Sequence, residues 1–306
     1  MPSQPEPKGA LNNLTATLAM LRRLEWRARL VVQSALGGEY KSSFRGKGME
    51  FDQVVKYEFG DDVRDIDWNV TARLGEAYRK KFVEEREITL LLLFEDTPSL
   101  QFGSGGVTKR AALLELASLL MLLSAVNGDR ISLLHATPQG YNLTKSATGR
   151  GRVMHTAANL LGHPAPPVLE EQEAKIPWKY VLKAAPRHSI FIWLGDFPGR
   201  ANPDVWPVLR RQYQPVGFRI SDPWELELPK RGSQPVYDPA SGELYTLDGG
   251  SSAQRAAHQS WKDKRDSQFK SLFPQESDRL SLTAGEDAIG AVTNFFHQRM
   301  KRFARV

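Results

Sequence analysis

The chain has no cysteine among its 306 residues. Disulfides, thiolate zinc sites and cysteine nucleophiles are therefore excluded, and we expect a cytoplasmic protein that reaches the inner membrane only through partners. Long apolar runs are also scarce. The longest, residues 111–126, contains Glu115 and two serines and is shorter than the roughly 20 residues of a bilayer span, so we expect no integral membrane segment.

Long basic runs are missing too, although the net charge is +6 and the pI is near 9.4. The basic clusters at residues 79–81, 150–152 and 301–305 are short, and no run alternates basic with aromatic residues, as single-strand binders tend to do. We interpret the surplus charge as a solvated surface and expect no nucleic-acid binding. The alternative, a basic nucleic-acid binder, rests on net charge alone.

Several enzyme motifs are absent. There is no G-x-S-x-G elbow, no H-E-x-x-H spacing and no G-x-x-x-x-G-K-[ST] phosphate loop. The segment GSGGVTKR has Lys109 at the lysine position of such a loop, but Thr108 and Arg110 replace the second glycine and the final hydroxyl residue. We therefore predict a loop with a helix cap at this point.

The order of apolar and polar segments predicts two parts. Residues 1–86 comprise a disordered leader (1–10), a helix (11–36) and a glycine- and charge-rich segment with short strands at 53–57 and 77–82. Residues 87–306 alternate strands with helices, which indicates an α/β fold with a doubly wound, mostly parallel sheet. The expected strands are 88–94, 130–136, 141–144, 189–194, 216–220 and 279–282, with a hairpin at 236–247; the expected helices are 108–126, 151–161, 171–184, 204–212, 254–272 and 286–303.

Two strongly apolar strands end in polar residues. The first is followed by Glu95, Asp96, Thr97 and Ser99, and the second by Asp196. Ligands of open α/β sheets bind beyond the carboxyl ends of the strands, and carboxylates with hydroxyls are the oxygen ligands that Mg²⁺ prefers. The alternative is that these side chains cap the turns that follow the strands.

The stretch from FRGKGMEF through GDDVRDIDW and FVEEREI to the first apolar strand, with DPWELELP and YDPASGELYTLD further on, resembles the bacterial domain-of-unknown-function family 58. The resemblance covers about residues 20–300. It implies a von Willebrand factor A-like fold. The glycine- and charge-rich residues 37–86, which we call the signature segment, would precede or decorate that fold. The resemblance also implies coupling to a MoxR-type AAA+ ATPase and to other von Willebrand factor A-type proteins.

Von Willebrand factor A domains carry a metal-ion-dependent adhesion site with the motif D-x-S-x-S, a later threonine and a later aspartate. By resemblance, Glu95 stands at the first aspartate, Thr97 and Ser99 at the serines, Thr148 at the threonine and Asp196 at the later aspartate. The expected cofactor is Mg²⁺, although glutamate in place of aspartate moves the carboxylate in a site of demanding geometry.

The signature GDDVRDIDW groups four aspartates around Arg64, followed by Arg73. One interpretation is a structural lock in which the four aspartates (Asp61, Asp62, Asp65 and Asp67) make fixed bonds to arginine and Trp68 buries its ring beside them. The alternative is an acidic active site or docking surface.

Two functions are expected, and the partner class in the first is what the resemblance implies. The first is a non-enzymatic protein-interaction module, an adaptor of a MoxR-type AAA+ ATPase in complex assembly or maturation, acting through a degenerate adhesion site. The second is a metal-assisted hydrolase that uses Glu95, Asp96 and Asp196 to hold the ion.

Overall fold

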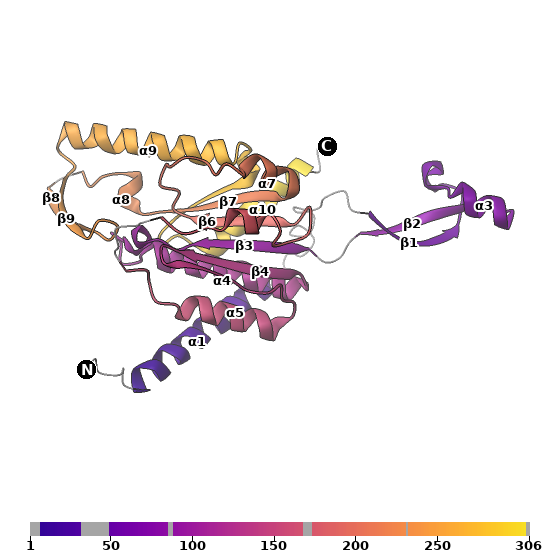
Figure 1. Ribbon diagram of the computed structural model, residues 1–306, viewed down its shortest axis with the longest axis horizontal. Coiled ribbons are helices and arrows are strands. Elements are labelled where there is room, and N and C mark those ends of the chain that lie inside the picture. Colours follow the sequence, from indigo (N-terminus) through magenta and orange to yellow (C-terminus); the bar gives the residue numbers. More distant parts are fainter. Residues whose placement is uncertain (1–6, 32–48, 85–87, 168–172, 231, 304–306) are drawn as a thin grey trace. The chain divides into compact units, whose positions relative to one another are not determined.

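A computed structural model describes residues 7–31, 49–84, 88–167, 173–230 and 232–303 (Figure 1). The chain divides into two compact units: residues 1–44 with 89–306, and residues 45–88. The sequence placed the N-terminal helix together with the signature segment in residues 1–86, whereas the smaller unit begins at residue 45 and helix α1 (Pro7–Val31) belongs to the larger unit. Of the predicted leader, residues 1–6 lie outside the described parts and residues 7–10 begin α1.

The larger unit contains a six-stranded sheet in the order β10-β7-β6-β3-β4-β5. Counted along the chain within this sheet, the order is 3-2-1-4-5-6, which is the doubly wound arrangement with its reversal between β3 and β6. All neighbours are parallel except the edge strand β5. The strands are β3 (Thr89–Glu95), β4 (Arg130–Thr137), β5 (Gly140–Leu143), β6 (Ile190–Gly195), β7 (Gln214–Ser221) and β10 (Arg279–Thr283). The predicted fold class, an α/β fold with a doubly wound, mostly parallel sheet, is confirmed.

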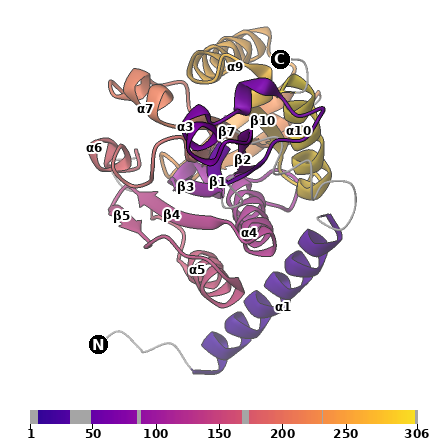
Figure 2. The same cartoon turned by 90° about the vertical axis from the view of Figure 1, so that its right-hand side faces the viewer.

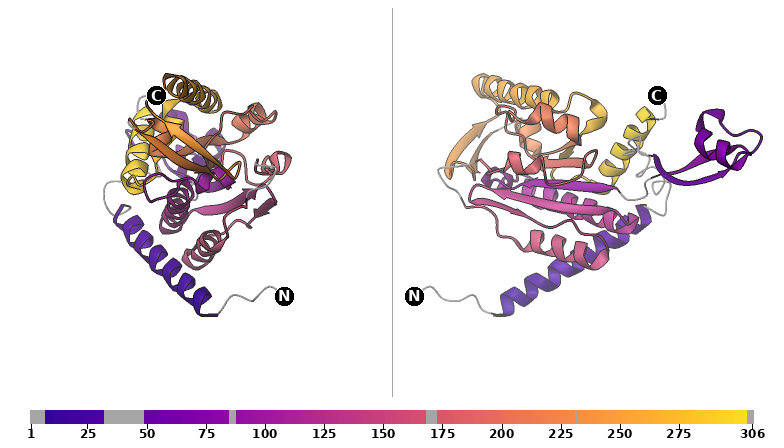
Figure 3. Two further views of the ribbon diagram at one scale, coloured as in Figure 1. Left: turned by 90° about the vertical axis from the view of Figure 1, so that its left-hand side faces the viewer. Right: turned by 45° about the vertical axis from the view of Figure 1, so that its right-hand side comes forward.

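Helices cover both faces of the sheet (Figure 2). One face carries α4 (Lys109–Asn127), α5 (Arg150–Gly162) and α10 (Ala288–Phe303), and α1 packs on α4 and α5 (Figure 3). The other face carries α6 (Trp178–Val181), α7 (Trp206–Gln212) and α9 (Ser252–Leu272). After β7 come α8 (Pro223–Leu226) and a hairpin of β8 (Ser233–Asp238) and β9 (Glu243–Asp248).

The two central strands are buried on both sides. Every residue from Leu90 to Glu95 is buried, because parallel strands between helical layers have no solvent face. Alternate side chains, such as Leu91 and Leu93, join Phe191 and Trp193 in an aromatic-rich core beneath α6, α7 and α9. This packing fixes the strand ends that carry the polar residues.

Helix α4 is long and apolar enough, by length and composition alone, to cross a membrane. In the fold, however, 67% of its most apolar window is buried. It contacts α1, α5 and α10 as well as the sheet, so its apolar surface is covered by neighbouring elements.

One predicted helix is much shorter in the structure. Residues 171–184 were expected to be helical, but only α6 (Trp178–Val181) forms there, and residues 168–172 lie outside the described parts. Pro177 immediately precedes α6, and a proline disfavours helical geometry in the residue before it. The expected long helix was therefore wrong.

The smaller unit is an antiparallel pair, β1 (Met49–Lys56) and β2 (Tyr78–Glu84), with a bulge between Phe51 and Gln53. Between its strands lie a short 3-10 turn, Val63–Asp65, and α3 (Trp68–Leu74). Short 3-10 turns also follow β3 (Pro98–Gln101) and precede β10 (Glu276–Asp278) in the larger unit. Both predicted strands of the signature segment are therefore present.

Candidate functional site

Side chains from the loops after β3 and β6 meet at the point where the strand order reverses. The hydroxyl of Ser99 donates a 2.6 Å hydrogen bond to Asp196 Oδ2. Thr97 Oγ1 lies 2.9 Å from Ser99 Oγ, and because the Ser99 proton is directed to Asp196, Thr97 is the donor in this second bond. The structure thus brings together three of the residues expected at the adhesion site.

The carboxylate of Glu95 bonds to two other side chains. It accepts a 2.7 Å hydrogen bond from Trp193 Nε1 and pairs with Arg200. Burial raises the pKa of Glu95, and the bonds from Arg200 and Trp193 act in the opposite direction. The extra methylene of glutamate therefore carries the carboxylate to partners of its own.

Asp96 is also held by a separate set of partners. Arg110 donates hydrogen bonds to both of its oxygens, with Nε 2.9 Å from Oδ1 and an NH₂ group 2.9 Å from Oδ2. His135 Nε2 lies 3.0 Å from Oδ2. Burial would raise the pKa of Asp96, but the hydrogen bonds from His135 and Arg110 outweigh it and lower the pKa. Asp96 is thus a paired anion inside the fold.

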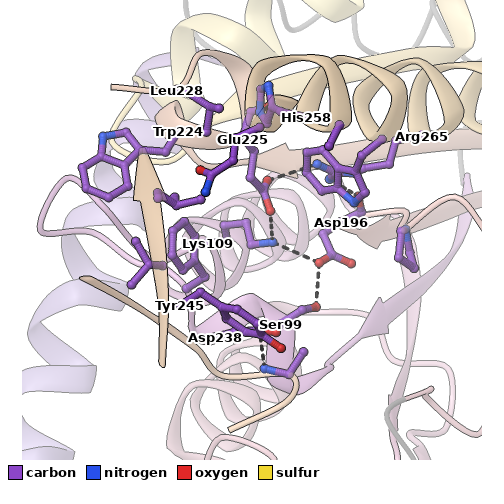
Figure 4. A pocket seen from close by; sticks show the side chains of 18 residues that line it. Ser99, Lys109, Asp196, Trp224, Glu225, Leu228, Asp238, Tyr245, His258 and Arg265 are labelled. Carbon is purple, nitrogen blue, oxygen red and sulfur yellow. Dashed lines mark hydrogen bonds and ion pairs between the residues drawn. The ribbon is translucent and has the colours of Figure 1, made fainter. Parts of the chain in front are cut away.

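Asp196 pairs with a buried lysine that comes from the first turn of α4. Lys109 Nζ lies 3.1 Å from Asp196 Oδ2 and 2.6 Å from Glu225 Oε1, as the dashed lines in Figure 4 show. Arg265 of α9 approaches the same acids: it donates to Glu225 Oε2 at 3.2 Å and to the backbone oxygen of Asp196. Two carboxylates and two cations therefore form an electrically balanced cluster, which we call the rim cluster (Ser99, Lys109, Asp196, Glu225, Arg265).

The charges of the rim cluster stabilise one another. Burial would raise the pKa of Asp196, but Lys109 and Arg265, together with the Ser99 hydrogen bond, lower it to about 2. Burial would likewise lower the pKa of Lys109, yet Asp196 and Glu225 outweigh it and raise the pKa above its usual range. Both groups are therefore ionised at neutral pH.

Thr148 does not join this site. It follows Ala147, which pairs with Ile131 at the beginning of β4, and Ile131 in turn pairs with Leu90 at the beginning of β3. Glu95 lies five residues further along β3, or about 16 Å at the rise of a strand. The prediction for Thr148 was wrong, because the residue lies near the amino ends of β3 and β4, whereas the rim cluster lies beyond the carboxyl ends.

The rim cluster does not fit the expected Mg²⁺. This ion needs a near-octahedral set of oxygens and water, whereas Asp196 already faces Lys109. A second group, Asp96 with His135 and His163, has ligand atoms within 4.8 Å of one another. Arg110, however, occupies both oxygens of Asp96, and its positive charge opposes a cation there.

A pocket of about 560 Å³ opens above the rim cluster. Its walls come from α8, the β8–β9 hairpin and α9, and they include Trp261. Trp224 and Tyr245 of the same walls are labelled in Figure 4. Tyr245 is 47% exposed and Trp261 is 38% exposed. An apolar pocket with a few polar groups at its floor is the usual form of a binding site at a switch point.

The signature segment forms only part of the expected lock. Asp67 caps α3 by accepting from the backbone of Asn69 and Val70, and Arg64 pairs with Asp62 at the surface. The side chains of Asp65 and Arg73 make no hydrogen bond or ion pair with the parts of the chain that are described.

Trp68 is 70% exposed, so the expectation that it buries its ring in this segment was wrong. Phe59 (107% exposed), Val63 (61%) and Leu74 (58%) are exposed in the same small unit. A segment this short has too few side chains to cover four large apolar groups.

Several site residues were not predicted from the sequence: Lys109, Arg200, Glu225 and Arg265. Two signals were available. Lys109 is a cation at a helix N-terminus, where the helix dipole opposes it, which suggests a compensating acid. Asp222 and Glu225 have capping-box spacing after an apolar strand, and the structure contains that box. Nothing in the spacing of Arg200 or Arg265 indicates their partners.

Comparison with known proteins locates the chain in a family. Uncharacterized proteins of Mycobacterium bovis and Mycobacterium tuberculosis are each 25% identical to it over 228 residues, covering 73% of this chain and 71% of theirs. The conserved hypothetical protein BatB from Bacteroides thetaiotaomicron aligns with a TM-score of 0.40 and 9% identity over 72% of this chain and 100% of that one. The pilus adhesin SpaC from Lactobacillus rhamnosus GG aligns with a TM-score of 0.38 and 10% identity over 85% and 37% of the respective chains.

Residues 53–268 match the family described as protein of unknown function DUF58. This match spans more than half of the chain and includes the signature segment from residue 53 onward, both rim loops, the β8–β9 hairpin and most of α9. The chain belongs to the DUF58 family.

Proposed function

We propose that the protein is a non-enzymatic interaction module that binds a partner protein in the pocket above the rim cluster. The partner class that we propose is the MoxR-type AAA+ ATPase, together with other von Willebrand factor A-type proteins, which the family resemblance implies. The observation that carries the proposal is the apolar pocket at the switch point of the sheet.

The chemistry of the pocket favours an apolar side chain as its occupant. Trp224, Tyr245 and Trp261 supply large, rigid walls, and such aromatic pockets are where interface binding energy concentrates. The floor is electrically balanced, because Lys109 and Arg265 neutralise Asp196 and Glu225. A strongly charged ligand would therefore gain little from the floor, whereas an aromatic or aliphatic anchor would be desolvated between the rings.

The pairing of the acids supports a non-catalytic role. A metal-assisted hydrolase would need Glu95, Asp96 and Asp196 to converge on one ion. Each instead faces a different cation, respectively Arg200, Arg110 and Lys109. No contact of these three side chains favours the hydrolase over the interaction module.

The test is to capture partners from the native cell with the tagged chain and then to measure the affinity of the purified ATPase. Tyr245→Ala and Trp261→Ala should each weaken binding by about tenfold or more, because they remove walls of the pocket. Trp26→Ala is the matched control, since Trp26 is a 64% exposed tryptophan on α1, away from the pocket lining.

Equal affinity of the wild type and both pocket variants for the ATPase would refute binding in the pocket. Failure of the wild type to bind the ATPase at all would refute the partner. Metal-dependent turnover by the isolated chain that Asp196→Asn abolishes would favour the hydrolase instead.

A further inference from the structure

The rim cluster brings oxygen atoms of three side chains close to one buried lysine. Ser99 Oγ and one oxygen each of Asp196 and Glu225 are hard oxygen atoms of the kind that Mg²⁺ and Mn²⁺ bind. Lys109 Nζ lies within hydrogen-bonding distance of both carboxylates, at 3.1 Å and 2.6 Å. The position between the two acids is thus filled by an ammonium group of the chain itself.

Two effects oppose a positive charge on Lys109 at this position. Its side chain is only 2% exposed, and burial disfavours a charged amine. It is also the first residue of α4, where the helix dipole repels a cation. The carboxylates of Asp196 and Glu225 must offset both effects, so the lysine and the acids depend on each other.

The charge balance is complete without a metal. A divalent ion between two carboxylates would bring two positive charges, and here Lys109 and Arg265 bring one each. The guanidinium of Arg265 is fixed by Trp261, whose ring lies 4.5 Å from it, and by the backbone oxygen of Phe197. An added Mg²⁺ would therefore have to displace a buried cation that is already paired.

We infer that Lys109 is a built-in cation that takes the place of the divalent metal, so that this rim works without a metal ion. Removal of the lysine side chain should convert the rim cluster into a divalent-cation site, since Asp196, Glu225 and Ser99 then face an empty space. The inference concerns the floor of the pocket and holds whether or not the pocket binds a partner protein.

The first experiment compares the thermal unfolding of the full chain in EDTA, in Mg²⁺ and in Mn²⁺. The second is a calorimetric titration with Mn²⁺, which counts the sites that bind the ion. We expect the melting temperature of the wild type to be the same in all three conditions. Lys109→Ala should melt at a lower temperature in EDTA, and saturating Mn²⁺ should raise its melting temperature by about 5 °C. The double variant Lys109→Ala with Asp196→Asn is the matched control and should lose the response to Mn²⁺.

Two results would overturn the inference. One is a single Mn²⁺ or Mg²⁺ site in the wild type that Asp196→Asn removes, which would show that the metal competes with the lysine. The other is a folded Lys109→Ala variant that binds no divalent cation. If Lys109→Ala does not fold, the same measurements are made on Lys109→Ser, which loses less polar contact. The Mn²⁺ titration of the wild type tests independently whether a metal competes with the lysine.

Discussion

Ser99 Oγ lies 2.6 Å from Asp196 Oδ2, although the two residues are 97 positions apart in the chain. The contact exists because β3 and β6 are neighbours at the reversal of the strand order, so that the loops after them begin side by side. Asp196 Oδ2 also accepts from Lys109, which makes this one oxygen the link between the β3 loop, the β6 loop and α4.

Because both bonds end on Asp196, we expect a substitution at Asp196 to lower the free energy of unfolding more than a substitution at Ser99. Ser99→Ala removes one hydrogen bond to a charged acceptor and should cost about 1.5 to 3 kcal/mol. Asp196→Asn leaves Lys109 with one acid fewer in a buried place and should cost about 3 to 5 kcal/mol. Urea unfolding of the two variants measures the order.

A double-variant cycle tests the cause of that loss. Lys109→Met combined with Asp196→Asn removes both charges, so it should be less destabilised than the sum of the two single variants. Simple additivity would contradict the proposed mutual dependence of the lysine and the acid.

A second prediction concerns the docking of α1. Glu25 of α1 is 6% exposed, and its carboxylate accepts from Arg150 of α5 and, at 3.0 Å, from Arg29. The hydrogen bond from Arg150 is the largest of the effects that lower the pKa of Glu25 from 4.5 to about 2. Because the folded pKa is depressed, the stabilisation is complete above pH 4.5 and is lost as the pH falls from 4.5 towards 2.

The size of this effect is limited by solvent. A lowering of the pKa of Glu25 from 4.5 to about 2 corresponds to about 3 kcal/mol in the free energy of unfolding. Because the side chain of Arg150 is 61% exposed, we expect a contribution of about 2 kcal/mol. Urea unfolding between pH 6 and pH 2 should show that the wild type loses about 2 kcal/mol more of its free energy of unfolding than Glu25→Gln, because Asp96 and Asp196 contribute to the pH dependence of both proteins. Glu227→Gln, at an exposed pair with Lys230, should leave the pH profile of the wild type unchanged.

A third prediction concerns the close approach of α9 to the sheet. A Cβ at Gly217 of β7 would lie 2.3 Å from the ring of Phe273 and 2.7 Å from that of Phe269. Both rings are buried and have no room to move, so Gly217→Ala should destabilise the chain by about 1 to 3 kcal/mol. Calorimetry should give an unchanged melting temperature for Gly105→Ala, where no atom lies within 4 Å of the new Cβ.

The signature segment gives a fourth prediction. Trp68 is 70% exposed, so Trp68→Ala should change the free energy of unfolding by no more than about 0.5 kcal/mol. Asp67→Ala removes the cap of α3 and should cost about 1 kcal/mol. Circular dichroism during urea titration measures both, and a larger loss for Trp68→Ala than for Asp67→Ala would show that the ring is buried in solution.

The interaction role, the absence of catalysis and the cytoplasmic location stay predictions, and the pocket variants and metal titrations described above address the first two. The adhesion-site prediction is changed in its chemistry. Ser99, Thr97 and Asp196 do meet, but Glu95 and Asp96 each have partners elsewhere, and Lys109 faces Asp196 where a metal was expected.

The sequence by itself determined the elements that depend on local pattern. The apolar runs 88–94 and 189–194 indicated buried parallel strands, and the polar residues that follow them indicated a site at their carboxyl ends. The family motifs indicated the fold class. These features are readable because burial, strand period and turn chemistry are properties of consecutive residues.

Only the tertiary structure decided which charges face each other. Lys109, Asp196, Glu225 and Arg265 come from four separate regions of the chain, and Thr148 lies far from them despite its suggestive position in the sequence. Pairing of this kind depends on strand order and helix packing, since a side chain's partner is chosen by proximity in space. The replacement of a metal by a lysine could therefore be recognised only once the strands and helices had been brought together.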